Sequence, residues 1–237
     1  MRELLLVGRR PVHEVVLAAG VDSAPILADI VALAGELRVP LRELSRSRFE
    51  ARARTEAPQG VLARAGPLPA ADLEALINAS EPDEAPFLLV VDGVTDPGNL
   101  GALLRTAEGA GVTAAILPRH RAARITPTVA KAAAGAIEHV PLVQVPGIPA
   151  ALAQLSDRGV WVVGLDDAGT ADIYDLAVAT EPVALVLGSE GRGLARLTRE
   201  RCDVLAGVRL HGHLESLNVS AAAAVACFEI RRRRSAR

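Results

Sequence analysis

The chain has 237 residues, enough for one large hydrophobic core or two modest ones. Half of its residues are apolar and its net charge is −2 at pH 7, so the whole-chain composition is that of an ordinary globular protein and does not indicate a nucleic-acid partner. No apolar stretch approaches the roughly 18 residues that span a bilayer. Two cysteines, Cys202 and Cys227, are too few for a disulfide framework and lack metal-ligand spacing, which favours a reducing cytoplasm and no metal site.

The first third of the chain alternates between short apolar runs and helical patterns. This pattern predicts a small α/β domain over residues 1–79. The acidic, Pro-containing segment 80–86 reads as a linker to the rest of the chain. The predicted elements are strands over 12–18, 39–44 and 60–65, and helices over 25–37, 47–54 and 68–79.

Residues 87–237 contain strands that are apolar throughout rather than at every second position. Such strands, alternating with helices, are typical of a parallel sheet covered on both faces. An Ala-rich run over 129–137 predicts one of the helices. The predicted strands cover 87–92, 113–118, 142–145, 160–166 and 182–188, with a possible sixth over 204–210.

The junction at residues 96–107, DPGNLGALLRTA, is the most informative segment of the chain. A buried strand ends in a Pro-Gly turn that carries Asn99, and a helix then begins with an apolar stripe on one face. At about 100° per residue, Arg105 lies off that stripe. Both side chains are expected near the carboxyl end of a strand, where open α/β sheets bind ligands. A turn amide and a solvated arginine are the simpler alternative.

Two further segments favour a functional role for Asn99 and Arg105 over this simpler alternative. Residues 185–194, LVLGSEGRGL, form an apolar strand and a glycine-rich loop with a carboxylate, Glu190, at its centre. The loop lacks the spacing of a phosphate loop or of a dinucleotide fingerprint, which argues against a Rossmann-type oxidoreductase. Residues 215–234 begin with Ser216 or Asn218 as the N-cap of a last helix, whose four consecutive alanines fit close packing against another element or subunit.

Basic residues gather in two places. Residues 42–54 carry five Arg against two Glu, and the chain ends in IRRRRSAR. Phosphate contacts would use such residues, but a solvated helix face or a basic helix end explains them equally well. Lys131 is the only lysine of the chain. The few aromatic residues argue against a domain that reads RNA by stacking bases.

In this order and spacing, DPGNLGALLRTAEGAG, LGSEGRGL and ESLNVSAAAA resemble the three motifs of the SpoU (TrmH) family. These are RNA ribose 2′-O-methyltransferases of the SPOUT class. The resemblance, joined by residues 131–145, covers nearly all of 87–232. It implies a C-terminal parallel sheet with a deep trefoil knot that binds S-adenosylmethionine, and a homodimer. Residues 1–79 resemble the small RNA-binding domain, similar to ribosomal protein L30e, of the branch that methylates a guanosine of 23S ribosomal RNA.

The resemblance also implies roles for individual residues. Arg105 would orient the ribose hydroxyl and stabilise developing charge, because an arginine is a poor general base in isolation. Asn99 would hold the ribose or Arg105, Glu190 would orient the arginine or the nucleotide, and Asn218 would shape the third loop. The expected cofactor contacts are Gly188, Val208, Leu210, Ser216 and Leu217. The expected RNA contacts are Arg46, Arg48, Arg52 and Lys131.

The chain departs from the family pattern in two places. Val208-Arg209-Leu210 stands where relatives have Ile-Pro-Met, so the cofactor loop lacks a rigid proline. The N-terminus begins close to the end of the helix that precedes the first strand in relatives. Three alternatives therefore accompany 23S ribosomal RNA methylation: methylation of tRNA, methylation of ribosomal RNA that confers antibiotic resistance, and a catalytically silent RNA-binding protein.

Overall fold

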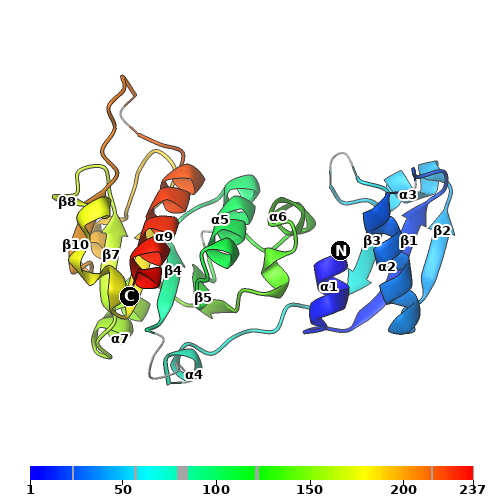
Figure 1. Ribbon diagram of the computed structural model, residues 1–237, viewed down its shortest axis with the longest axis horizontal. Helices are drawn as coiled ribbons and strands as arrows, with labels where there is room; N and C mark the ends of the chain where they lie inside the picture. Colours follow the sequence, from blue (N-terminus) through cyan, green and yellow to red (C-terminus); the bar gives the residue numbers. More distant parts are fainter. Residues whose placement is uncertain (23, 56–57, 79–84, 121–122, 215, 237) are drawn as a thin grey trace.

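A computed structural model describes residues 1–22, 24–55, 58–78, 85–120, 123–214 and 216–236, arranged around two sheets. Figure 1 shows the sheets in two units that lie side by side along the long axis of the molecule. We call them the small-sheet unit, residues 1–66, and the large-sheet unit, residues 85–236. Most of the linker predicted over 80–86 lies outside the described residues.

The small-sheet unit is a three-stranded sheet in the order β2-β1-β3, with β1 parallel to β2 and antiparallel to β3. The helices α1 and α2 bury Leu5 and Ile30 against Val15 of β1. The elements are α1 (Arg2–Val7), β1 (Val12–Ala18), α2 (Pro25–Glu36), β2 (Leu41–Leu44), α3 (Arg46–Arg52) and β3 (Val61–Ala65).

The large sheet contains seven strands in the order β6-β5-β4-β9-β7-β10-β8, and every pair of neighbours is parallel. This arrangement confirms the parallel sheet expected from uniformly apolar strands. The strands are β4 (Phe87–Val91), β5 (Ala114–Pro118), β6 (Leu142–Val145), β7 (Trp161–Leu165), β8 (Ala171–Asp172), β9 (Val183–Leu187) and β10 (Val204–Gly207).

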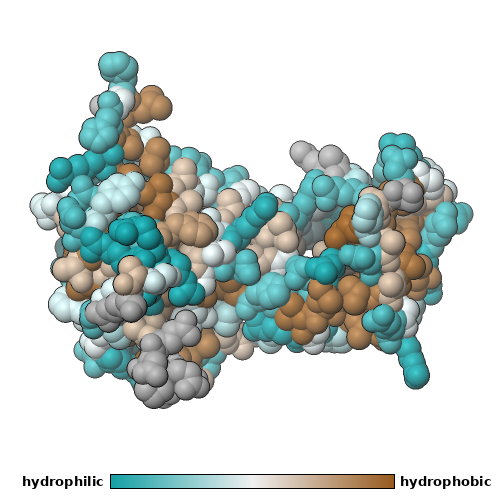
Figure 2. Space-filling model, in the orientation of Figure 1, coloured by the Kyte–Doolittle hydropathy of each residue, from teal (hydrophilic) through white to brown (hydrophobic). Residues whose placement is uncertain are grey.

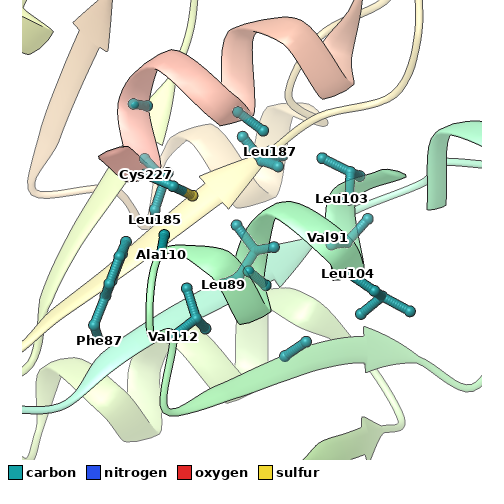
Figure 3. Packing of buried hydrophobic residues seen from close by; sticks show 14 of the residues in the cluster. Phe87, Leu89, Val91, Leu103, Leu104, Ala110, Val112, Leu185, Leu187 and Cys227 are labelled. Carbon is teal, nitrogen blue, oxygen red and sulfur yellow. The ribbon is translucent and has the colours of Figure 1, made fainter. Parts of the chain in front are cut away.

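Helices cover both faces of the large sheet. On one face, α5 (Pro97–Gly109) and α9 (Val219–Ser235) pack side by side over β4 and β9, and Figure 3 shows Leu103 and Cys227 meeting strand residues such as Leu89. On the other face, α7 (Ile148–Ser156) and α4 (Leu73–Asn78) bury a second apolar cluster. The remaining elements are α6 (Pro127–Ala132), α8 (Arg196–Arg199) and the 3₁₀ turns η1 (Ala136–Glu138), η2 (Ile173–Asp175) and η3 (Ala177–Thr180).

Three predicted elements are shorter than expected by about three residues or more. The helix predicted over 129–137 ends at Ala132, because Ala134 and Gly135 have φ values of 51° and 102° and turn the chain into η1. The strand predicted over 204–210 ends at Gly207, where its neighbour β8 is only two residues long. The helix predicted over 68–79 covers only α4. Ala70, which precedes it, pairs instead with β6 in an isolated bridge.

The two units are joined by charged contacts at the start of the chain. The guanidinium of Arg10 makes two hydrogen bonds to the buried carboxylate of Glu138, one of them 3.0 Å long, and donates to the carbonyl of Gly66 at 3.0 Å. Glu3 lies 2.8 Å from His139 Nε2 and occupies the space beside Gly135. A buried bidentate ion pair has a defined geometry, so Arg10 and Glu138 fix one unit against the other.

Candidate functional site

Three polar side chains from distant parts of the sequence form a chain of hydrogen bonds beyond the carboxyl ends of the large sheet. Asn99 Nδ2 donates to Glu190 Oε1 at 3.1 Å, and Asn218 Nδ2 donates to Asn99 Oδ1 at 3.1 Å. Asn99 is thus paired through both ends of its amide. The structure brings together one residue from each of the three motifs found in the sequence, and we call these three residues the polar triad.

Asn99 is held in place by the first turn of α5. Asp96 is the N-cap of this helix and its carboxylate accepts a hydrogen bond from the Asn99 backbone N–H at 2.6 Å. Pro97 follows at the first helical position, where its missing N–H costs nothing. The helix cap therefore fixes the backbone of Asn99 independently of the contacts that its side chain makes.

Glu190 lies at the exposed tip of a loop that folds back on itself. Ser189 and Gly193 exchange two backbone hydrogen bonds of 3.0 Å at the base of the loop. Gly188 is buried there, and a Cβ atom at this position would lie 2.1 Å from the carbonyl carbon of Gly193. Gly191 and Gly193 have φ values of 75° and 65°. The glycines of the motif are therefore required by the shape of the loop.

Asn218 is the N-cap of α9, which confirms one of the two capping residues considered from the sequence. Its Oδ1 accepts hydrogen bonds from the Ser220 N–H at 2.9 Å and the Ser220 hydroxyl at 2.6 Å. Its Nδ2 is thereby left to contact Asn99. Capping and site formation are thus two uses of one side chain. Ser216 and Leu217 lie just before it and are both exposed.

The segment between β10 and α9 leaves its main chain open to a ligand. Val208 and Leu210 are half-buried, and Arg209 between them forms an ion pair of 2.9 Å with Asp172. From Arg209 to Leu217, leaving aside the undescribed Glu215, no backbone hydrogen bond is recorded. Gly212 also has open space where a Cβ atom would lie. Free N–H groups donate and free C=O groups accept hydrogen bonds, and together they can hold the edge of an adenine, while the N–H groups can hold an amino-acid carboxylate.

Arg105 is exposed on α5, two turns beyond Asn99. Within the described part of the chain it has no recorded hydrogen bond or ion pair. The two hydrogen bonds that join the polar triad do not involve Arg105. Its outward position agrees with its place off the apolar stripe of the helix.

The arginines and the lysine expected to contact RNA divide into two groups. Arg46 and Arg48 are exposed on the outer part of α3, where Arg46 forms an ion pair with Glu50 at 3.1 Å. Arg52, at the end of the same helix, is directed to the buried Glu14 of β1, and Lys131 lies on α6 beside the junction of the two units.

The C-terminal arginines have a role that the sequence did not reveal. Arg234 donates to the carbonyls of Ala179 at 3.0 Å and Glu181 at 2.6 Å, and its guanidinium lies 5.2 Å from the centre of the Phe87 ring. Arg233 donates to the Leu176 carbonyl at 3.0 Å. These two side chains dock α9 onto the large sheet. Both residues also lie in the last turn of α9, so the basic helix end expected from the sequence is confirmed, and the docking contacts come in addition to it.

A buried hydrogen bond below the polar triad was also not predicted from the sequence. The Thr198 hydroxyl of α8 donates to Asp92 Oδ2 at 2.5 Å, and Thr198 is 1% exposed. Asp92 follows β4 and starts the segment that leads to Asn99, whereas Thr198 follows the loop of Glu190. The bond therefore ties together the bases of two segments whose tips meet in the Asn99–Glu190 contact. Only the apolar run ending in Asp92 was visible in the sequence.

Two absences concern the described residues only. No group of three or more His, Cys, Asp or Glu side chains there could hold a metal ion. No helix there is both long and apolar enough to cross a membrane.

Comparison with known proteins agrees with the three motifs. Residues 86–228 match the SpoU rRNA Methylase family, and residues 2–71 match the family described as RNA 2′-O ribose methyltransferase substrate binding. The chain is 43% identical over 215 residues to the 23S rRNA (guanosine-2′-O-)-methyltransferase RlmB of Pseudomonas putida, covering 90% of this chain and 85% of that protein. It is 42% identical over 212 residues to the RlmB of Vibrio cholerae, covering 90% and 84%.

A solved structure supports the fold over the whole length of the chain. The SpoU methyltransferase AviRb from Streptomyces viridochromogenes, in complex with AdoMet, superimposes with a TM-score of 0.81. The match covers 99% of this chain and 87% of that one, at 23% identity. Both the small-sheet and the large-sheet units therefore have counterparts in one known architecture.

Proposed function

The chain belongs to the SpoU rRNA methylase family, and on that premise we propose that it transfers a methyl group from S-adenosylmethionine to a ribose 2′-hydroxyl of RNA. The proposed substrate is a guanosine of 23S ribosomal RNA, because the similar proteins of Pseudomonas putida and Vibrio cholerae bear that name. A protein acting on ribosomal RNA would work in the cytoplasm.

The polar triad is the observation that carries this proposal. Asn99, Glu190 and Asn218 are separated by up to 119 residues in sequence and are joined by two hydrogen bonds at the end of a parallel sheet. Each also depends on a local device: an aspartate cap, a glycine loop or a helix N-cap. A catalytically silent scaffold would not need three separate local structures that each position a side chain at the Asn99 amide.

The reaction requires in-line placement of two groups and removal of one proton. A ribose hydroxyl is a weak nucleophile until its proton leaves, so orientation and charge stabilisation are the main tasks of the protein. We assign Arg105 to the hydroxyl and the adjacent phosphate, where a permanent positive charge stabilises the developing oxyanion. The polar triad would hold the ribose, with Glu190 fixing the orientation of the Asn99 amide.

The residues present fit the cofactor. We propose that main-chain groups of Gly188, Val208, Leu210 and Leu217, with Ser216 beside them, hold the adenine and the methionine part. The main chain over 209–214 and 216–217, for which no backbone hydrogen bond is found among the described residues, supports this assignment. S-adenosylmethionine would supply a methyl group that is already electrophilic on its sulfonium. We also propose that the C-terminal part of the large-sheet unit forms the trefoil knot of the family.

The exposed position of Arg105 supports a shared site in a homodimer. Arg105 has no recorded partner within the described chain, and Phe228 of the neighbouring α9 is 50% exposed. We propose that Arg105 of one subunit completes the polar triad of the other. Mixing inactive Arg105→Ala and Asn218→Ala subunits should then restore part of the activity, since one of the two sites in a mixed dimer is intact. A mixture as inactive as its components would contradict the shared site.

The test of the function is transfer of a tritiated methyl group to purified 23S ribosomal RNA, with tRNA as the second substrate. We expect labelling of 23S ribosomal RNA, reduced by a factor of about 10² to 10³ in Arg105→Ala. Arg158→Ala, on the opposite face of the large sheet, is the matched control and should label normally. Labelling of tRNA alone would change the substrate, and cofactor binding without labelling of either RNA would support the silent RNA-binding protein.

A further inference from the structure

Two cavities adjoin along the small-sheet unit and form one groove. The first, of about 400 Å³, lies between the two units and is lined from both sides, by β3 and by α6. The second, of about 640 Å³, lies over the face of the small sheet next to the end of α3. Thr55, Pro127 and the β3 residues Leu62, Ala63 and Ala65 line both cavities. In Figure 2 the molecular surface is indented where the two units meet.

The groove has the opposite charge to the rest of the molecule. Among the described residues, its lining contains two carboxylates, Glu14 and Glu138, and both are buried and bonded to arginines. It also contains five cationic side chains, whereas the whole chain carries a net charge of −2. The five are Arg10, Arg52, Arg54, Arg64 and Lys131. Clustered positive charge on a slightly acidic protein favours an anionic partner.

The cavity between the units adds an apolar lining to this charge. Leu4, Val61, Ile125 and Ile137 contribute to its walls, and the Arg10–Glu138 ion pair closes one side. Gln59, Thr126 and Lys131 supply polar groups. Its volume falls within the range of roughly 300–1,000 Å³ found for ligand pockets. An apolar slot with a few hydrogen-bonding groups accommodates a planar base, and the cationic part beside it accommodates phosphates.

We propose that an unpaired segment of the substrate RNA lies in this groove, with one base in the cavity between the units and its phosphates against Arg54 and Arg64. The inference deepens the proposed function, because it names the RNA element that the enzyme holds away from the polar triad. A base can enter the cavity only when it is not paired, so the groove selects single-stranded RNA over duplex. An acidic peptide would satisfy the arginines but would leave the apolar slot unused.

The groove also revises which arginines contact RNA. Arg46 and Arg48 line neither cavity, although they belong to the same basic helix as Arg52. Arg54 and Arg64 line the groove and were not singled out from the sequence. The two pairs are matched: Arg64 and Arg46 each form one ion pair, with Glu14 and Glu50, and within the described residues no ion pair is found for Arg54 or Arg48.

The experiment compares the double variants Arg54→Ala/Arg64→Ala and Arg46→Ala/Arg48→Ala in the full-length protein. The probe is a fluorescein-labelled, unstructured oligoribonucleotide of about 20 nucleotides, with the same strand in a duplex as a second probe. Anisotropy at several salt concentrations gives the affinity and its salt dependence. We expect the wild type to prefer the single strand. The groove variant should bind it about tenfold more weakly, with a salt slope reduced by about 1.4, or 0.7 for each lost phosphate contact.

The control variant should bind like the wild type and keep its salt slope. Equal weakening in both double variants, or in neither, would overturn the proposal. So would a wild type that binds the duplex as tightly as the single strand, or one from which polyglutamate displaces the RNA at equal charge. Because RNA binding is measured without S-adenosylmethionine, a failure of the groove proposal can be distinguished from a failure of the proposed methyl transfer.

A second substitution tests the base in the cavity. Ala130→Leu of α6 adds three carbon atoms to the wall of the cavity, whereas Ala150→Leu adds them on the exposed surface of α7. We expect Ala130→Leu to weaken binding of the single strand at least threefold at an unchanged salt slope, because it removes space and no charge. Thermal unfolding of both variants should match the wild type. Unchanged affinity in a folded Ala130→Leu protein would place the base elsewhere and contradict this part of the proposal.

Discussion

The two sheets differ in where their charged residues lie. The strands of the large sheet contain no charged residue except Asp172 in its edge strand, and the polar groups of the candidate site lie beyond the strand ends. The small sheet has Glu14 in the middle of its central strand, 6% exposed, with Arg52 and Arg64 bonded to it. A sheet buried on both faces must be apolar, whereas a sheet with one face turned to a groove can carry a neutralised charge.

This difference separates the tasks of the two units. The large sheet provides a rigid edge on which exact polar contacts can be built, since neighbouring strands fix the start of each loop. The small sheet provides a charged surface, and the electrostatic interactions of this surface depend on salt and pH. We therefore expect substitutions near the polar triad to change the rate of the reaction, and substitutions in the small sheet to change affinity and acid stability.

The largest effect is expected for Asn99→Asp. The new carboxylate would no longer donate to Glu190 and would place a second negative charge about 3 Å from it. We expect methyl transfer to fall by about 10² to 10³ with the fold retained. Gln144→Glu, exposed on β6, is the control because it also replaces an amide by a carboxylate but lies outside the site. Near-normal transfer by Asn99→Asp would remove the polar triad from the mechanism.

A smaller effect is expected for Thr198→Val. Loss of the hydroxyl leaves Asp92 without its recorded bond, which costs about 1–3 kcal/mol of stability, and loosens the base of the Glu190 loop. Thr113→Val is matched, because its hydroxyl accepts from the Phe87 N–H at 3.0 Å at the other end of β4. We expect both to lower the melting temperature.

Only Thr198→Val should also lower kcat, by a factor between about 10 and 10². Thr198→Ser, which keeps a hydroxyl, should recover most of that loss. If Thr198→Val and Thr113→Val reduce kcat equally, the Asp92–Thr198 bond supports the fold alone.

Acid stability tests the charged strand. Hydrogen bonds from Arg64 and Arg52 lower the pKa of Glu14. A lowered folded pKa gives stability that is present above the unfolded pKa of about 4.3 and is lost as pH falls through the folded value. Denaturant unfolding at several pH values should show this loss in the wild type and a flatter profile in Glu14→Gln. Glu43→Gln, on the exposed edge strand β2, should keep the wild-type profile, and an equal flattening there would contradict the assignment.

Local patterns were enough to predict most strands and the region of the candidate site. β1 and β6 have the predicted ends, and the three sequence motifs contain Asn99, Glu190 and Asn218. The hydrogen bonds between them could not be predicted, because they depend on how β4 and β9 pair across the sheet. The ion pair between Arg10 and Glu138 is hidden for the same reason. The break at Ala134 reflects packing of Glu3 against Gly135, which helix propensity does not contain.

The last prediction concerns the two cysteines, which both belong to the large-sheet unit. Burial raises the pKa of Cys202 and of Cys227 to about 12, so about 10⁻⁴ of each thiol is ionised near pH 8. Iodoacetamide should therefore label the native protein about three orders of magnitude more slowly than a free cysteine. Ile30→Ala removes core volume from the small sheet and Leu104→Ala from the large one.

We expect labelling to stay slow in Ile30→Ala and to rise in Leu104→Ala, because only the second variant opens the core around Cys227. The rate of alkylation, followed by mass spectrometry, measures this directly. If Ile30→Ala accelerates labelling as strongly as Leu104→Ala, the two sheets unfold as one cooperative unit. The Arg10–Glu138 contact would then couple their stabilities as well as their orientation, and the division of tasks between them would not extend to folding.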